Sequence, residues 1–181
     1  MVYVFLADGF EEIEALTPVD ILRRAGIEVK TVGVGAKVIT GSHGIPVTCD
    51  ITENEAELKN TDAVILPGGM PGTLNLEKSQ TVCAFIDYAY KNSKLIGAIC
   101  AAPSILGKKG ILKGKNATCF DGFEKQLEGA KIISAPAVRD GMIVTSCGAG
   151  AASDFAFLLL EVLKDNKTAQ ALRSGMKYRE G

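Results

Sequence analysis

The sequence contains a single histidine, no tryptophan and no two cysteines spaced as CxxC. A zinc site would therefore depend mostly on thiolates, and their spacing shows no zinc-binding motif. An odd number of cysteines also argues against a disulfide framework and favours a reducing, cytoplasmic location. We predict neither a metal nor an organic cofactor. The five cysteines stand at positions 49, 83, 100, 119 and 147.

An excess of positive charge is also absent. The 20 basic and 21 acidic residues leave a formal net charge of -1, so no basic field indicates binding to nucleic acid or to an anionic membrane. No apolar stretch approaches the roughly 18 residues that a membrane span needs. The apolar run 2–7 lacks a basic lead and meets Asp8 at once, so we interpret it as a strand rather than a signal peptide. The nearly neutral net charge fits a small-molecule substrate better than a polyanion.

Apolar segments that resemble strands alternate with segments of helical periodicity. This alternation is typical of a mostly parallel sheet covered by helices on both faces, so we predict an α/β fold. With no repeat and no linker, the 181 residues predict a single domain, 1–181. The expected strands are 2–6, 29–34, 63–66, 95–99, 116–119 and 142–146, with a small hairpin made by 38–39 and 45–48. The expected helices are 11–25, 82–90, 102–106 and 151–163, and the tail from 168 is a polar helix or coil.

Four of these segments lie where an α/β protein places its site. In open sheets of this kind, ligands bind beyond the carboxyl ends of the strands. The segment 8–14 is acidic, 68–72 and 146–150 are rich in glycine, and 100–103 carries a thiol. Their convergence predicts a functional site at this edge of the sheet.

Cys100 is the strongest candidate for chemistry. It lies between an expected strand and an expected helix, and its neighbours are small, as in GAICAAP at 97–103. Small neighbours suit a sharp strand-to-helix turn that lifts a nucleophile above the sheet. The adjacent helix N-terminus would favour the thiolate and lower its pKa. A buried structural cysteine is the alternative.

The glycine pair and the acidic cluster each leave two interpretations open. Gly68 and Gly69 either present backbone N–H groups to an oxyanion or form an ordinary turn. Glu11, Glu12 and Glu14 either form the solvated first turn of a helix, or one of them shares a proton with the thiol. Their spacing alone does not select which one.

The remaining polar candidates are weaker. Cys49, Cys83, Cys119 and Cys147 are interpreted as packing residues. For Cys119, which ends an expected strand, a place in the lining of the pocket is the alternative. His43 is expected at the surface or at an interface. The segment GAGAAS, 148–153, nearly matches a dinucleotide fingerprint, but Ser153 replaces the third small residue and little chain follows, so we do not predict nucleotide binding.

Four motifs together resemble the ThiJ/PfpI superfamily in order and spacing. They are LADGFEEIE at 6–14, LPGG at 66–69, AICAAP at 98–103 and TSCGAG at 145–150. The resemblance covers essentially the whole chain and is closest to the parkinsonism-associated protein deglycase subgroup and its bacterial relatives. It implies a flavodoxin-like three-layer sandwich and a homodimer. We expect the dimer interface at the helix that carries Arg23 and Arg24 and at the loop of His43.

The resemblance also implies roles for individual residues. Cys100 matches the oxidisable nucleophile, Glu14 the protonated glutamate that hydrogen-bonds the sulfur, and Gly69 and Ala101 the positions whose amides bind an oxyanion or a cysteine sulfinate. Ala101 stands where peptidase-like members carry histidine, which argues against a protease dyad. Phe120 stands where the deglycase subgroup presents a histidine to the thiol, so Glu14 would move protons itself. The further pocket residues expected are Glu11, Cys119, Phe120 and Gly148.

Three functions follow as hypotheses. The first is a cysteine-dependent, cofactor-free glyoxalase or deglycase acting on small α-oxoaldehydes or their adducts under oxidative and carbonyl stress. The second is a redox sensor or chaperone without turnover, switched by oxidation of Cys100. The third and weakest is a cysteine hydrolase or peptidase with an unrecognised base.

Overall fold

A central sheet organises the chain. The computed structural model describes residues 1–178. The sheet has seven strands, β1 (Val2–Leu6), β2 (Val29–Gly33), β5 (Ile51–Thr52), β6 (Ala63–Leu66), β7 (Leu95–Ile99), β10 (Ala137–Asp140) and β11 (Ile143–Ser146). Their order is β10-β11-β7-β6-β1-β2-β5, and every neighbouring pair is parallel except β10 with β11.

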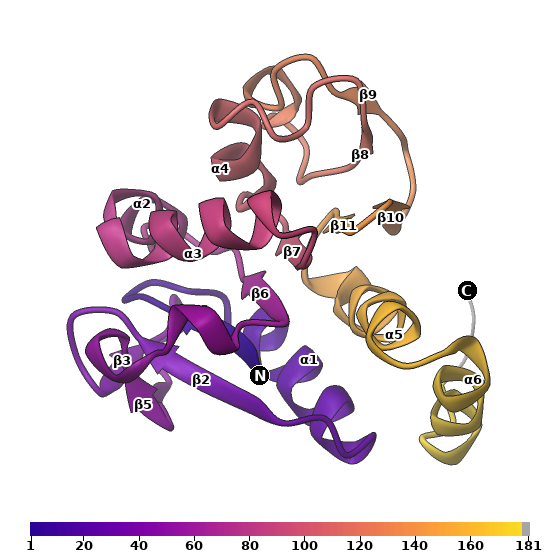
Figure 1. Ribbon diagram of the computed structural model, residues 1–181, viewed down its shortest axis with the longest axis horizontal. Helices are drawn as coiled ribbons and strands as arrows, with labels where there is room; N and C mark the ends of the chain where they lie inside the picture. The colour runs from indigo at the N-terminus through magenta and orange to yellow at the C-terminus, as the bar shows by residue number, and fades with distance from the viewer. Residues whose placement is uncertain (179–181) are drawn as a thin grey trace.

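Helices cover both faces of this sheet (Figure 1). The alternation of side chains along β1 shows why: Val2, Val4 and Leu6 enter one apolar core, whereas Tyr3 and Phe5 enter the other. The fold is therefore a flavodoxin-like α/β sandwich of three layers, as predicted. One helical layer comprises α1 (Glu12–Arg24), α5 (Ala152–Leu163) and α6 (Asn166–Gly175), and the other α2 (Gly72–Lys78), α3 (Gln80–Lys91) and α4 (Pro103–Lys108).

Smaller elements lie outside the main sheet. The predicted hairpin is confirmed as the antiparallel pair β3 (Val38–Thr40) and β4 (Pro46–Thr48). A second small pair, β8 (Asn116–Ala117) and β9 (Lys131–Ile132), is parallel. Short 3-10 helices occur at Glu53–Glu55, Leu58–Asn60, Glu124–Gln126 and Ala149–Ala151.

Most predicted elements are confirmed to within a few residues, and one strand is corrected. The prediction of a strand over 116–119 is wrong in extent, because β8 ends at Ala117. The next residue, Thr118, donates its backbone N–H to the hydroxyl of Thr145 at 2.9 Å instead of to another strand's backbone. The sequence did not predict α2, β5, β9 or β10. No helix formed by residues 1–178 combines the length and apolar character that crossing a bilayer requires.

Candidate active site around Cys100

Cys100 follows β7 directly and occupies the sharp turn that the sequence predicts. Its φ of 64° is unusual for a residue other than glycine. Two backbone hydrogen bonds fix the turn: the Cys100 N–H donates to the carbonyl of Ser146 at 2.8 Å, and the Phe120 N–H donates to the carbonyl of Cys100 at 2.9 Å. The half-buried side chain packs against the core that contains α1.

Of the three glutamates at the start of α1, Glu14 is the one that reaches Cys100. Its carboxyl group is hydrogen-bonded to the Cys100 thiol, and Glu14 is 1% exposed. The Gly68 N–H donates to Glu14 Oε2 at 2.9 Å. Glu11 caps the helix instead, because its Oε2 accepts the Glu14 N–H at 2.7 Å. The carboxyl group of Glu14 therefore lies between two partners, the Cys100 thiol and the Gly68 N–H.

The three backbone amides expected to form an oxyanion site divide into two groups. The N–H groups of Gly69 and Ala101 both donate to the sulfur of Cys100. Gly68 corrects our expectation, because its N–H is already committed to Glu14. A side chain at Gly68 would also place a Cβ 2.6 Å from both Cys100 Cβ and Glu14 Oε2. Gly68 thus provides space and orients Glu14, and only Gly69 and Ala101 face the reactive atom.

The pKa values of the thiol and the carboxyl group are both raised. Burial raises the pKa of Glu14 to about 7, although the hydrogen bonds from Cys100 and Gly68 act in the opposite direction. Burial, and then the charge of Glu14, raise the pKa of Cys100 to about 12, against the N–H groups of Ala101 and Gly69. The predicted low thiol pKa is therefore wrong, because burial, and then the adjacent carboxylate, outweigh the effect of the short helix α4. Above about pH 7, where the carboxyl group of Glu14 is ionised, the pair holds one proton, which lies on the sulfur.

A pocket of about 650 Å³ opens above this pair. Glu11 and Phe120 line it, as the sequence predicts, and Phe120 is 50% exposed. His43 was expected at the surface and is exposed, but it also borders this pocket. The complete lining is Glu11, Glu12, Ile13, Glu14, His43, Ile45, Cys100, Phe120 and Ala149. Sequence reasoning missed Ile13, Ile45 and Ala149, whose approach depends on how the loops pack.

Glu12 anchors the loop that brings His43 to the pocket. Its carboxyl accepts the backbone N–H of His43 at 2.9 Å and contacts the ring Nδ1 of His43, also at 2.9 Å. Burial alone would raise the pKa of Glu12, but the hydrogen bonds from His43 outweigh it and lower the pKa. Hydrogen bonding to Glu12 raises the pKa of His43.

A metal ion could in principle be held by this same corner of the site. Ligand atoms of Glu11, Glu12 and His43 lie within 4.8 Å of one another, and no other such group occurs among residues 1–178. The contacts already described, capping by Glu11 and loop anchoring by Glu12, account for these positions without an ion. We assign the cluster a structural role.

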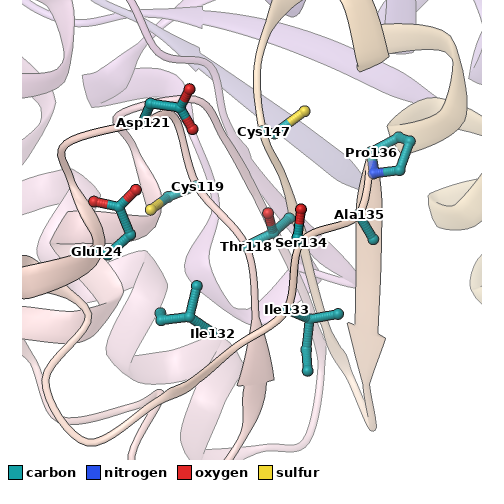
Figure 2. A pocket seen from close by; sticks show the side chains of 10 residues that line it. All are labelled: Thr118, Cys119, Asp121, Glu124, Ile132, Ile133, Ser134, Ala135, Pro136 and Cys147. Carbon is teal, nitrogen blue, oxygen red and sulfur yellow. The ribbon is translucent and has the colours of Figure 1, made fainter.

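Two further residues expected at the pocket lie beside it. Cys119 lines a separate pocket of about 450 Å³ together with Cys147 (Figure 2). Gly148 lines a pocket of about 530 Å³ between these two. The expectation for Cys119 is therefore corrected, because the segment between β8 and β10 carries it to a neighbouring hollow. Gly148 follows β11 and lies at the edge of the Cys100 pocket, since a Cβ at Gly148 would stand 3.3 Å from the ring of Phe120 and 4.0 Å from Glu14 Oε1. Cys147, interpreted as a packing residue, lines both neighbouring pockets.

Comparisons with known proteins agree with this architecture. The model of the DJ-1/PfpI family matches residues 1–162. Protein dj-1beta of Drosophila melanogaster is 33% identical over 176 residues, which cover 96% of this chain and 94% of that protein. The Parkinson disease protein 7 homolog of Danio rerio is 34% identical over 176 residues, with 94% and 93% covered.

Solved structures are similar over nearly the whole chain. A crystal structure of a cysteine-to-alanine mutant of a DJ-1 superfamily protein from Salmonella typhimurium has a TM-score of 0.92 at 35% identity, covering 99% of this chain and 98% of that one. Oxidized DJ-1 of Toxoplasma gondii has a TM-score of 0.91 at 33% identity, with the same coverage. The chain belongs to the DJ-1/PfpI family. Its general role is that of this family, which includes enzymes.

Proposed function

We propose that the protein is a cysteine-dependent, cofactor-free enzyme of the glyoxalase or deglycase type, acting on small α-oxoaldehydes or their adducts. The observation that supports this most is the contact set of Cys100: a carboxyl group and two backbone N–H groups all meet its sulfur. A nucleophile, a proton carrier and an oxyanion site are the three parts that such chemistry needs.

The reaction begins with transfer of the shared proton. Glu14 takes the thiol proton as the sulfur of Cys100 attacks the aldehyde carbon, so the thiolate forms only when it is used. The N–H groups of Gly69 and Ala101 stabilise the oxyanion that develops. Glu14 then returns the proton to this oxygen, which gives a hemithioacetal and restores the carboxylate.

A proton is next moved between carbons. The Glu14 carboxylate removes the proton from the former aldehyde carbon, and the neighbouring ketone oxygen takes up the hydroxyl proton of the hemithioacetal as an enediol forms. Glu14 then delivers its proton to the neighbouring carbon while the C=O bond of the thioester forms, which gives the thioester of a 2-hydroxy acid. Water then cleaves the thioester and regenerates the Cys100 thiol. Methylglyoxal plus water gives lactic acid, so the overall reaction is an internal redox change that needs no external electron carrier.

Formation of lactate from methylglyoxal without glutathione tests this proposal. We expect many molecules of lactate per molecule of protein, because the thiol is regenerated in each cycle. An equal concentration of N-acetylcysteine serves as the control, since a free thiol forms the hemithioacetal but lacks Glu14 and the amides. Consumption of methylglyoxal without lactate, in proportion to protein, would show covalent modification only and would contradict the proposal.

A redox sensor is the second candidate, favoured by the same two N–H groups and by the exposure of part of the thiol. In that case peroxide oxidises Cys100 to the sulfinate, whose oxygens accept these N–H groups and the proton of Glu14. Site-resolved mass spectrometry after mild peroxide treatment should then find Cys100 oxidised well before Cys83, which is also half-buried. Equal oxidation of both cysteines would contradict a sensor.

We also propose that two copies of the chain associate through α1 and the loop that follows β3. Ile13 and Ile45, one from each segment, are 55% and 52% exposed, and Leu16 of α1 is 37% exposed. Covering these apolar side chains would favour association. Sedimentation velocity is expected to give the mass of two chains, with Ile13→Asp shifting it towards that of one. A single-chain mass for the unmodified protein would contradict the proposal.

A further inference from the structure

The pocket above Cys100 is larger than methylglyoxal requires. Its volume is about 650 Å³, and pockets of about 300 to 1,000 Å³ usually hold molecules of drug size. Methylglyoxal carries nothing but a methyl group beyond its aldehyde and ketone groups. A substrate with a bulkier group on the ketone carbon would therefore fill space that methylglyoxal leaves empty.

The acidic side chains at the outer part of this pocket already have partners within the protein. Glu11 caps α1 by accepting the Glu14 N–H. Glu12 accepts the backbone N–H of His43 and contacts the ring Nδ1 of the same residue. A substrate group that extends away from the reacting carbon therefore finds few polar partners there. A strongly polar group would lose its hydration without full compensation, whereas an apolar group would not.

Phe120 provides apolar surface at the wall of the pocket. It is 50% exposed and lines the pocket together with Ala149. Ile13 and Ile45 line the pocket as well, but they belong to the surface proposed above for association of two copies. Phe120 and Ala149 are thus the apolar residues that remain for a ligand. An aromatic ring offers a large, flat surface against which aliphatic and aromatic groups pack.

Several contacts fix Phe120 relative to the reacting groups. The Phe120 N–H donates to the carbonyl of Cys100 at 2.9 Å, and the Phe120 carbonyl accepts the Phe123 N–H at 3.1 Å. The ring lies against Gly148, where an added Cβ would stand 3.3 Å from it and 4.0 Å from Glu14 Oε1. Phe120 is therefore in place beside the nucleophile and the proton carrier before a ligand arrives, and binding need not order its backbone.

We propose that Phe120 is a specificity-determining residue, and that the site prefers α-oxoaldehydes whose ketone carbon carries a branched aliphatic or aromatic group. This group packs on the ring of Phe120 while the aldehyde carbon meets the sulfur of Cys100. The choice of substrate rests on the function proposed above, whereas the packing of an apolar group on Phe120 does not. In an apolar pocket a single methylene group changes the specificity ratio by about 10- to 200-fold, so a preference of about tenfold is expected.

Alkylation of Cys100 tests this wall without any turnover. Iodoacetamide and N-benzyl-iodoacetamide carry the same reactive group, so the ratio of their rates removes the effect of the thiol's own pKa. N-acetylcysteine in solution gives the intrinsic ratio. Measured by site-resolved mass spectrometry, the ratio of the benzyl reagent to iodoacetamide is expected to be about tenfold higher at Cys100 than for N-acetylcysteine. An equal or lower ratio at Cys100 would overturn the proposal.

Phe120→Ala is expected to lower the alkylation ratio at Cys100 to near its intrinsic value. The ring is half exposed, so its removal should leave the fold intact, which circular dichroism checks. Tyr90→Ala is the matched control: Tyr90 of α3 is also 50% exposed but lies outside the Cys100 pocket, and its loss should leave the ratio unchanged. Phe120→Leu should give an intermediate ratio, because it keeps apolar surface but not the ring. The unmodified protein's ratio persisting in Phe120→Ala would overturn the role of Phe120.

Turnover of two aldehydes tests the choice of substrate. Isobutylglyoxal and methylglyoxal differ only in the alkyl group on the ketone carbon, so the ratio of their kcat/KM values reports how that group packs. We expect Phe120→Ala to lower this ratio by about five- to tenfold and Tyr90→Ala to leave it unchanged. An unchanged ratio in Phe120→Ala would overturn the role of Phe120 in substrate choice. If neither aldehyde is turned over, the proposed function fails, and the alkylation rates at Cys100 still decide whether Phe120 holds an apolar group.

Discussion

Replacing Cys100 with serine should abolish lactate formation from methylglyoxal, by about a thousandfold or more. The reason is geometric as well as chemical. The Glu14 carboxyl and the N–H groups of Gly69 and Ala101 are all directed at the sulfur. A serine hydroxyl has the same connectivity but is a far weaker acid than a thiol, and its ester would form and break less readily than a thioester.

The matched control for this variant is Cys83→Ser. The thiol of Cys83 lies on α3 and contacts only the carbonyl of Glu77, at 3.4 Å, among the hydrogen bonds of the described residues. Its replacement should leave turnover unchanged. Continued lactate formation by Cys100→Ser at a rate similar to that of the unmodified protein would remove Cys100 from the mechanism. Circular dichroism of both variants separates loss of chemistry from loss of the fold.

Replacing Glu14 with glutamine should lower turnover by about 10² to 10⁴-fold while leaving the thiol able to react. Glutamine keeps an oxygen for the Gly68 N–H but cannot carry a proton between carbons. It also removes the charge that raises the pKa of Cys100, so alkylation by iodoacetamide should persist. Full turnover in Glu14→Gln would exclude Glu14 as the proton carrier.

The pH dependence of alkylation by iodoacetamide further distinguishes the unmodified protein from Glu14→Gln. In the unmodified protein Glu14 must be ionised to accept the thiol proton, and its pKa is raised to about 7. Below that pH the carboxyl already holds a proton, so the alkylation rate should rise as the pH increases through about 7. Glu14→Gln should lack this step and follow the ionisation of the thiol alone. A step near neutral pH that survives in Glu14→Gln would have to come from another group, and His43 would be the first to examine.

The position of Cys100 could be predicted from sequence, because it depends on local pattern. A buried apolar strand that runs into small residues at 97–103 predicts a sharp turn, and the turn is present with its positive φ. The strands β1, β6 and β7 could be predicted for the same reason. Their continuous apolar runs are typical of parallel strands that are buried on both faces.

The choice between Glu11, Glu12 and Glu14 could not be made from spacing. Successive residues of a helix point about 100° apart, so the exact start of α1 decides which carboxyl meets the thiol. In the structure Glu11 caps the helix, Glu12 turns to the loop of His43, and Glu14 reaches Cys100. Only the resemblance to a known family selected Glu14 in advance.

The thiol pKa and the outer pocket residues depend on contacts that are distant in sequence. The dipole argument for a low pKa considered only the helix after Cys100, but Glu14 from α1 determines the charge beside the sulfur. Cys119 was misplaced because the path from β8 to β10 leaves the main sheet. Local periodicity does not describe such a path.

The proton shared by Glu14 and Cys100 exists only while three distant stretches of chain remain together. Glu14 comes from α1, Gly69 follows β6 and Cys100 follows β7. If α1 separates by local unfolding, the sulfur loses its carboxylate neighbour and becomes an ordinary thiol with a pKa of about 8.5. Electrophiles too large for the native pocket would then reach it. Modification of Cys100 by such large electrophiles would therefore be found mainly on molecules in which α1 has begun to separate, and its extent would measure this local unfolding.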